Sequence, residues 1–382
     1  MSRILIPFDD SMRFGQGYNS FLHAPCIEDA VRFKDIYSRQ EPTSSDGSIS
    51  QNVDYSSRFV DKISDVAKRL NVSAGSSIKK GGIIGTGYSV ELNETKFMAS
   101  DVNAMVSVKV INQTTELLGT AKFEPRDGHK LDSESFVKIY GDCFISGFVE
   151  GGELTGMVSA KVLNVENKTA VEKAIKSHIS SCCTKSGRKM DVALDGNDST
   201  SETESAMKQT DESITVCWLG GGGINPDGRP WTLESLYAAA TAFPSKVAQY
   251  PKPTWAILTP YDQTKNFVTW AKNHGIQLAQ FETAQAYASD LLDMYMEYCG
   301  CTSQIRTILE DPGAYVARAV DNAVGTGMGE LLRARNMLEA QRDAISEIID
   351  KLAIHPEDIE EIKKQHPIEA PELWAARLPI RN

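Results

Sequence analysis

Four consecutive glycines, Gly220–Gly223, are the first place in the sequence where residue types and spacing could do chemistry. They follow an apolar stretch that is typical of a buried strand, and they precede a predicted helix that begins near Trp231. Backbone amides in such a turn can form a nest that binds an anion. However, the run matches neither the phosphate-loop nor the dinucleotide-binding glycine pattern, and no lysine stands where a phosphate loop needs one. A plain strand-to-helix connection explains the same residues.

Thiols and imidazoles are the other groups that could act as nucleophiles or metal ligands. The seven cysteines include no CxxC pair, and the six histidines are scattered along the chain. His178 stands close to Cys182 and Cys183, which would suit a thiol nucleophile or a metal, although the end of a surface helix explains the same pattern. No GxSxG, HExxH or DxDxDG motif occurs. The sequence therefore predicts no catalytic residue, no cofactor, no metal site and no enzymatic activity.

Composition and charge narrow the class of protein further. Of the 382 residues, 41% are hydrophobic, which is enough for the core of a large domain or of two or three smaller ones. The net charge of −11 argues against nucleic-acid binding, which needs a basic face. Because the sequence shows no secretory signal and no apolar run of transmembrane length, we expect a cytoplasmic protein that a non-classical route could release.

The elements that would position these groups alternate between helix and strand up to about residue 270. Residues 56–70 place apolar side chains at helical spacing and predict an amphipathic helix. Residues 102–110 alternate strictly between apolar and polar side chains, which predicts a strand with one buried face. By similar patterns, further strands are predicted at 143–163, 214–219 and 254–261, and further helices at 168–180 and 231–242.

From about residue 262 the pattern is helical alone. Residues 328–353 contain a short heptad repeat made by Leu331, Leu338, Ile345 and Leu352. Such a helix can pack on its own domain or form a dimer seam, and the sequence leaves both alternatives open. The aromatic residues between Trp218 and Trp270 likewise suit either a core or a surface for lipid or a partner.

Gly151 and Gly152 interrupt an otherwise strand-like stretch, YGDCFISGFVEGGEL, at residues 140–154. Glycine inside a strand marks a bulge, a sharp bend or the close approach of another backbone. The apolar residues on both sides favour a strongly bent strand in a curved sheet. The alternative is an ordinary hairpin turn through Glu150, the two glycines and Glu153.

The same stretch resembles the signature of the membrane attack complex/perforin proteins, which belong to one superfamily with the cholesterol-dependent cytolysins. The residues that match the signature are Tyr140, Gly141, Phe144, Gly151 and Gly152. Asp142 and Cys143 depart from it, because the signature has Thr or Ser and then His at these positions. The preceding residues 69–117 resemble the stonustoxin branch, and the resemblance covers about residues 50–270.

This resemblance implies an α+β fold with a bent, twisted, four-stranded antiparallel sheet that carries two helical clusters. It implies a domain over residues 1–270, with its clusters at about 54–98 and 166–212, and a helical C-terminal region over 271–382. The sheet strands would be 102–112, 143–163 and 214–219, plus one strand from the N-terminal region.

In lytic members of the family, many subunits assemble into a ring and the two clusters unwind into membrane-spanning hairpins. The signature residues would then be structural, and the glycine pair would lie at the bend where the sheet must open. Replacing Gly151 and Gly152 with valine is accordingly expected to block opening while it spares the folded monomer.

The charges of the two clusters weigh against insertion into a membrane. Read as a strand, residues 56–70 carry charges on both faces, and a lysine or arginine at the bilayer midplane costs about 2–4 kcal/mol. The second cluster contains almost no apolar residue over 195–213. The resemblance predicts a perforin-like protein that binds membranes and oligomerises and that could form a pore. The first alternative is a non-lytic interaction protein of the same fold, and the second is an uncharacterised enzyme. The expected partners are membrane lipid, further copies of the chain and a second protein component.

Overall fold

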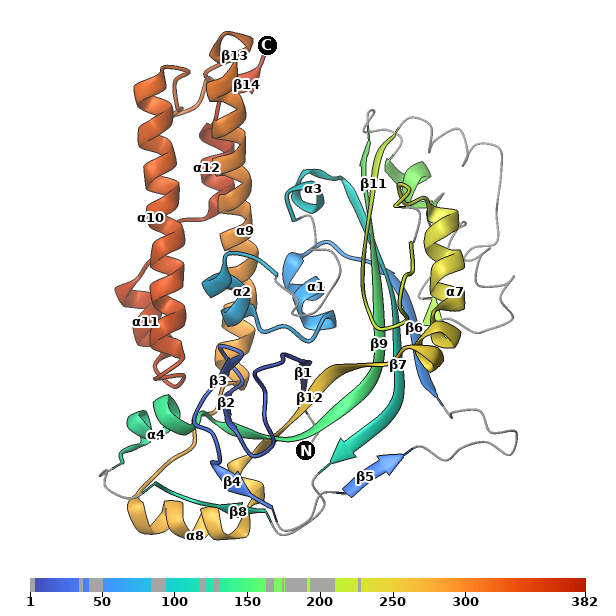
Figure 1. Cartoon of the computed structure of the whole chain (residues 1–382). Helices are drawn as coiled ribbons and strands as arrows, with labels where there is room; N and C mark the ends of the chain where they lie inside the picture. Colours follow the sequence, from blue (N-terminus) through green and yellow to red (C-terminus); the bar gives the residue numbers. More distant parts are fainter. Residues whose placement is uncertain are drawn as a thin grey trace.

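A large curved sheet with helices on both faces, and a long pair of helices beside it, make up the protein (Figure 1). The computed structural model describes residues 4–33, 37–40, 51–83, 94–116, 121–126, 131–162, 168–173, 175, 191–192, 210–225 and 228–382. The expected helix at 168–180 and the second cluster at 166–212 therefore lie largely outside the described residues, as do His178, Cys182 and Cys183.

The sheet is mostly antiparallel, and the described residues contribute ten strands to it. Its two longest strands, β7 (Val102–Glu116) and β9 (Cys143–Val162), pair with each other along nearly their whole length. The far edge of β7 pairs with β6 (Asn52–Phe59) and β5 (Tyr37–Gln40). The far edge of β9 pairs first with β12 (Lys252–Pro260) and then with β11 (Thr210–Leu219).

Short strands complete the sheet and two small ribbons. β1 (Ile4–Pro7) pairs with β12, β2 (Gly17–Asn19) pairs with β9 and with β3 (Ala24–Pro25), and β10 (Asp191–Val192) runs parallel to β6. Two ribbons lie outside the sheet, one formed by β4 (Val31–Arg32) with β8 (Lys122–Phe123), the other by β13 (Tyr315–Val316) with β14 (Ile380–Arg381).

This sheet is larger than the four strands expected from the sequence. The strands expected at 102–112, 143–163 and 214–219 are present as β7, β9 and β11, and the strand predicted at 254–261 joins them as β12. The helix predicted over 56–70 is wrong in its first part, because β6 pairs with β7 as far as Phe59 and α1 (Ile63–Arg69) begins only afterwards. Pairing with β7 satisfies the backbone of this segment, and it outweighs the local helical spacing.

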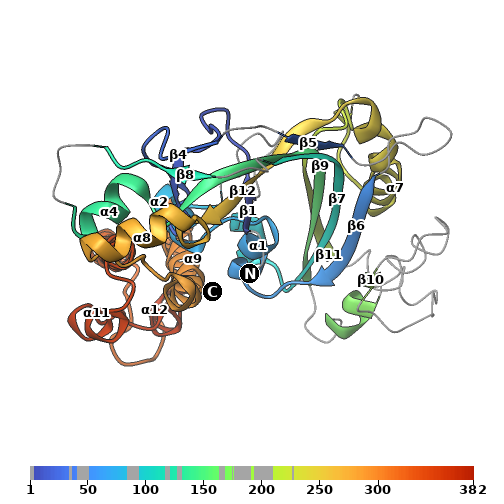
Figure 2. The same cartoon turned by 90° about the horizontal axis from the view of Figure 1, so that it is seen from below.

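Helices cover the sheet on opposite faces (Figure 2). On one face α7 (Leu233–Gln249) packs on the apolar side chains of β7 and β9, and the helical residues 168–173 add Val171 to the same core. On the other face lie α1, α2 (Ala74–Lys80) and α3 (Glu94–Ala99), as Figure 1 also shows. Near the first residues of β9, α4 (Ser133–Tyr140) and α8 (Lys265–His274) enclose a separate aromatic core together with the short 3-10 helix η2 (Tyr261–Gln263).

The C-terminal region is an antiparallel helical pair, α9 (Glu282–Glu310) and α10 (Met328–Leu352), with η3 (Pro312–Ala314) in the connection between them. Two short helices, α11 (Ile359–Gln365) and α12 (Pro371–Arg377), pack against it. The four heptad residues of α10 are fully buried inside the chain, so the dimer-seam alternative is wrong. Within the described residues, no helix has both the length and the apolar character that a bilayer crossing requires.

Candidate functional site

The glycine pair Gly151–Gly152 lies inside β9, which continues unbroken from Cys143 to Val162, so the hairpin-turn alternative is wrong. At this point β9 changes its neighbour, because Gly151 faces Lys252 of β12 whereas Glu153 faces Leu219 of β11. On the opposite side, the register with β7 shifts between Ile111 and Gln113. The pair thus divides β9 into a lower half, residues 143–150, and an upper half, residues 153–162.

Close contacts with backbone atoms require glycine at this point. A Cβ atom on Gly151 would lie 1.9 Å from the carbonyl oxygen of Val110, and one on Gly152 would lie 2.9 Å from the carbonyl oxygen of Leu219. Gly220, which has a φ of +77°, approaches them so closely that its Cβ would lie 2.6 Å from the oxygen of Gly151. The expectation that valine at 151 and 152 spares the folded monomer is therefore wrong, because neighbouring main chain already occupies the space.

The glycine run after β11 is a tight turn whose backbone groups bond within the chain. Gly220, Gly221 and Gly222 all have positive φ angles. The amide of Gly221 donates to the carbonyl of Tyr250 over 2.8 Å, and the carbonyl of Gly223 accepts from Nζ of Lys246 over 3.2 Å. These contacts favour the strand-to-helix connection over the anion-binding nest.

Helix α7 lies directly on the glycines of the upper half. A Cβ on Gly152 would lie 2.5 Å from Val247 and 3.1 Å from Phe243, and a Cβ on Gly156 would lie 2.4 Å from Leu236. The absence of side chains at 152 and 156 lets the helix approach the sheet closely. Leu236, Phe243 and Val247 are fully buried in this contact.

A buried amide network also ties α7 to the bend. Asn112, in the bulge of β7, donates from Nδ2 to the carbonyl of Val247 over 3.1 Å. Gln51 donates from Nε2 both to Oδ1 of Asn112, over 2.8 Å, and to the carbonyl of Pro244, over 3.0 Å. Two carbonyls near the C-terminal end of α7 thereby gain partners, which fixes the helix on this face.

The other signature residues form a packing unit at the beginning of β9, and the structure does not bring them to the glycine pair. Tyr140 is buried, its hydroxyl accepts from the amide of Arg126 over 2.9 Å, and its carbonyl accepts from the hydroxyl of Tyr261 over 2.8 Å. Gly141 has a φ of +75°, and a Cβ there would lie 2.0 Å from the carbonyl oxygen of Tyr18. The ring of Phe144 packs 5.5 Å from that of Tyr261.

The two departures from the signature form buried polar contacts that the sequence did not reveal. The carboxylate of Asp142 accepts from the amide of Ser20 over 2.7 Å and from its hydroxyl over 2.6 Å. The thiol of Cys143 donates to the carbonyl of Tyr18 over 3.2 Å. Burial raises the pKa of the Asp142 carboxyl and of the Cys143 thiol. In the sequence, the only sign of these buried contacts was a carboxyl group within an otherwise apolar stretch.

The aromatic residues from Trp218 to Trp270 belong mainly to the core. Tyr237 and Phe243 are buried beneath α7, and Trp255, Tyr261 and Phe267 are buried around β12 and α8. The core interpretation is therefore correct for these five, and Tyr250 is the member that is largely exposed.

The upper half of the sheet has a polar face on the side opposite α7. Ser107 lies between Ser56 on β6 and Thr155 on β9, and all three are buried. Next to them, Nζ of Lys109 lies 3.5 Å from Oε1 of Glu153, a carboxylate with no exposed surface. The sequence predicted one buried face for β7, but both faces are covered, because the first helical cluster lies over the polar one.

Contact between α1 and this face is polar at one end and apolar at the other. Arg69 donates from Nη1 to Oγ of Ser56 over 2.8 Å, and Lys109 donates from Nζ to the carbonyl of Arg69 over 2.7 Å. A cavity of about 450 Å³ beside these bonds is lined mainly by charged side chains. On the same face, Met105 and Met157 are buried in one core with α1.

The apolar side of the same cluster packs mainly on α9 and α10, and its core also includes Met105 and Met157 of the sheet. Ile63 and Val66 of α1 belong to one core with Leu292 and Met296 of α9. Lys62 at the start of α1 makes no side-chain cap, so the cap comes from another element. The carboxylate of Asp293 on α9 accepts from the amide of Ser64 over 2.9 Å and from its hydroxyl over 2.8 Å. This pair of bonds satisfies an orphan donor in the first turn of α1.

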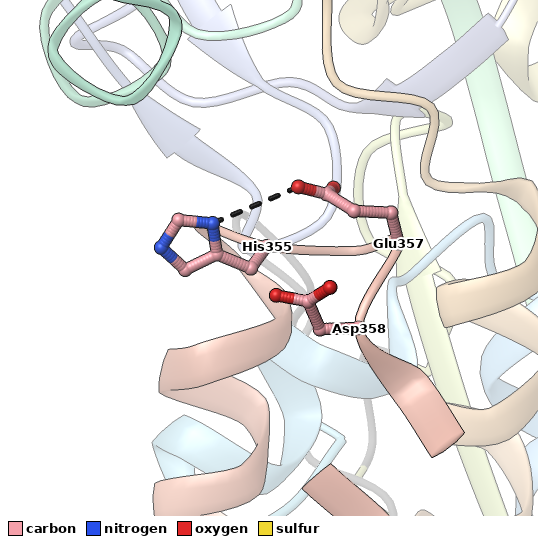
Figure 3. Close-up of side chains that lie close together, drawn as sticks. All are labelled: His355, Glu357 and Asp358. Atoms are coloured by element: carbon pink, nitrogen blue, oxygen red, sulfur yellow. Dashed lines mark ion pairs between the residues drawn. The ribbon is translucent and has the colours of Figure 1, made fainter. Parts of the chain in front are cut away.

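Three groups that could ligate a metal ion lie on the turn after α10 (Figure 3). The ligand atoms of His355, Glu357 and Asp358 lie within 4.8 Å of one another, and Nδ1 of His355 is 3.7 Å from Oε1 of Glu357. Nε2 of His355 also lies 4.0 Å from a carboxylate oxygen of Glu134 on α4. All these groups are exposed, which is common for acidic side chains in water, and we assign no metal to them.

Comparison with solved structures identifies the fold. No family model matches the chain, and no curated protein matches its sequence. The structure of stonustoxin is similar to it with a TM-score of 0.52 at 10% identity, covering 98% of this chain and 47% of stonustoxin. GNIP1Aa from Chromobacterium piscinae gives a TM-score of 0.34 at 13% identity over 72% of this chain and 57% of its own, and pneumolysin gives 0.32 at 12% over 56% and 41%.

The chain has the fold shared by the membrane attack complex/perforin proteins and the cholesterol-dependent cytolysins, as the signature resemblance implied. It spans about half of the length of the stonustoxin chain that it matches. At these identities the similarity establishes the fold, and the activity has to be argued from the chain's own residues.

Proposed function

We propose that this protein acts on membranes as a perforin-like assembly, in which copies of the chain associate and the first helical cluster leaves the sheet. The polar face beneath α1 carries this proposal. Ser56, Ser107, Lys109, Glu153 and Thr155 would all meet water if α1 departed, and water solvates such groups readily. Met105 and Met157 are the apolar residues of this face that would be exposed with them. The opposite face is apolar and glycine-lined, and it could not lose α7 in the same way.

The connections between the strands suit an extension of the sheet. β6 leads through residues 60–101 into β7, and β9 leads through residues 163–209 into β11. Both connections leave the same end of the four neighbouring strands β6, β7, β9 and β11. Each contains about forty residues or more, and two membrane-spanning strands need about 9–11 residues each.

The outer strands of this group suit self-association. Within the described part of the chain, β11 pairs with β9 on one side, and β10 pairs with β6 only at Ser56 and Ser57. The edge of a strand carries backbone donors and acceptors to which a second copy can add. β6 and β11 lie on opposite sides of the four strands, so that head-to-tail addition can continue around a ring.

Departure of α1 requires that its contacts with α9 break. The bonds from Ser64 to Asp293 and the shared apolar core are the contacts at stake. Locking the two helices together is therefore a direct test, and the pair Ser64→Cys with Asp293→Cys places two thiols where the native side chains already touch.

The experiment measures dye release from liposomes, with electron microscopy of the same samples. We expect the wild type to release dye and form rings. The oxidised double-cysteine variant should stay folded and inactive, reduction should restore release, and each single-cysteine variant should behave the same with or without oxidant. Release by the verified oxidised double variant would show that α1 need not leave. A folded wild type that neither releases dye nor forms rings on any lipid would overturn the proposal.

A second candidate, a non-lytic interaction protein of the same fold, is favoured by the charges of the two connections. Asp61, Lys62, Asp65, Lys68 and Arg69 fall on both faces of the first connection if it is read as a strand. Residues 195–209 of the second are almost entirely polar. This candidate predicts membrane binding or rings without dye release, an outcome that the same experiment distinguishes.

A further inference from the structure

The far end of the α9–α10 pair exposes aliphatic side chains, and we define residues 311–332 with 378–382 as the tip. Within 312–329 the only charged residues are Arg318 and Asp321, although 24% of the whole chain is charged. Five large apolar side chains of the tip are exposed: Val316 (41%), Val320 (48%), Met328 (66%), Leu332 (36%) and Ile380 (40%). Such a cluster marks an interaction surface, because single exposed apolar residues are common but grouped ones are not.

The tip holds these side chains in place by backbone hydrogen bonds. Val316 and Ile380 lie opposite each other in the ribbon of β13 and β14, and the amide of Asn382 donates to the carbonyl of Ala314 over 2.9 Å. Arg318 donates from Nε to the carbonyl of Leu378 over 3.0 Å. Met328 and Leu332 stand four residues apart on α10 and so share a face. Their exposure is therefore a feature of an ordered structure.

Position and charge point to the occupant of this surface. Figure 1 shows the tip beyond the end of the sheet at which β6 and β9 finish and their connections leave. The tip contains two arginines, Arg318 and Arg381, and three acidic residues, Asp311, Asp321 and Glu330, a net charge of −1, so it is nearly neutral in a chain whose total is −11. Exposed aliphatic side chains on a nearly neutral surface match the interface of a lipid bilayer, where apolar groups enter the headgroup region.

We propose that the tip is a lipid-contact surface that inserts Val316, Val320, Met328, Leu332 and Ile380 shallowly into a membrane. The proposal rests on the membrane function proposed above and assigns the first contact to the C-terminal region. It orients the molecule with the ends of β6 and β9 toward the bilayer. The exposed tip side chains are aliphatic rather than aromatic, which fits lipid better than a protein interface enriched in Tyr and Trp.

The test compares two full-length variants with equal added charge in vesicle flotation, using phosphatidylcholine vesicles with and without phosphatidylserine. The tip variant carries Val316→Asp, Val320→Asp and Met328→Asp. The control carries Val268→Asp, Tyr250→Asp and Met337→Asp, which are also exposed apolar positions but lie outside the tip. We expect the tip variant to bind at least about tenfold more weakly than the wild type and the control to bind nearly as well as the wild type. Circular dichroism should show that both variants are folded.

A second measurement reports the position of the tip directly. Tryptophan introduced by Met328→Trp should be quenched by brominated lipid, whereas tryptophan introduced by Val268→Trp should not. Equal binding of the tip variant and the wild type, or no quenching at 328, overturns the tip proposal even when the wild type releases dye. Tip-dependent binding without dye release or rings would leave it standing and remove only the pore. If the tip variant instead separates a wild-type dimer and binds vesicles normally, a second copy covers the surface and the lipid proposal is wrong.

Discussion

The two halves of β9 differ in what covers them, although one strand forms both. The lower half begins at buried signature residues and runs between β7 and β12, with Asp142 and Cys143 bonded to main chain or side chains of β2 and the residue after it. The upper half carries α7 on its apolar face and α1 on a face with polar contacts and a cavity. Under the proposed function, the cover above the glycine pair would change while the lower half would remain in place.

The junction between the halves, at Gly151 and Gly152, should tolerate substitution least. Gly151→Val would place side-chain atoms on the carbonyl of Val110, so we expect a loss of more than about 4 kcal/mol in the free energy of unfolding and little folded protein. Urea denaturation followed by circular dichroism measures it. Gly300→Ala is the control: Gly300 lies within α9 with open space around it, and alanine there should stabilise by about 0.5–1 kcal/mol. A well-folded Gly151→Val protein would contradict the close contact at the junction.

The stability of the polar face of the upper half should depend on the ion pair between Lys109 and Glu153. Lys109→Met removes the ammonium group beside the fully buried Glu153, and the loss of one partner of a buried pair costs about 3–5 kcal/mol. Adding Glu153→Gln to the same variant removes the buried charge and should recover most of that loss. The measurement is the urea midpoint of unfolding of the single and the double variant. Equal midpoints would mean that the ion pair does not stabilise this face.

Helix α1, which lies over the upper half, should become less stable when the Asp293 carboxylate that caps it is removed. Asp293→Ala leaves the first turn of α1 without a partner, which costs about 0.5–2 kcal/mol for a lost cap. Hydrogen exchange should speed up over residues 63–80 and stay unchanged over 140–150. In Asp293→Asn the side-chain oxygen can still accept from the amide of Ser64, so its exchange rates should lie closer to those of the wild type. If hydrogen exchange became faster by the same factor over residues 63–80 and 140–150, the two halves would not differ in how firmly they are held.

The lower half should respond to pH through Asp142, with the smallest effect of the four. Burial raises the pKa of this carboxyl above its ordinary value, so the folded state holds its proton more tightly than the unfolded state does. This contribution to stability is full below about pH 4 and is lost as the pH rises through the raised pKa. In Asp142→Asn, Oδ1 can still accept from the amide of Ser20, and Nδ2 can donate to the Ser20 hydroxyl where the second carboxylate oxygen had accepted. The variant should flatten the pH dependence, and we expect a change below about 1 kcal/mol near pH 4.

Thermal unfolding of the wild type and the Asp142→Asn variant between pH 4 and 8 provides the measurement. Parallel stability curves for the two proteins would assign the pH dependence to other groups. Tyr140→Phe, which removes the hydroxyl that accepts from Arg126, is a matched change in the same packing unit that carries no charge near neutral pH.

Local patterns along the chain already determined the long strands, the C-terminal helices and the signature. The alternation in β7, the apolar runs of β9 and β12 and the heptad positions of α10 are periodic, and the period of a segment follows from its own residues. The glycine pair could be recognised as a bend for the same reason, since missing side chains are visible in the sequence itself.

Tertiary structure alone decided which partner each face met. β6 became a strand because β7 lay beside it, and the polar face of β7 became buried because α1 lay over it. Asp293 caps a helix more than two hundred residues away, and Gly151, Gly152 and Gly220 meet although β9 and β11 are separated by a long connection. Such contacts depend on distances across the fold, and no property of one segment encodes them.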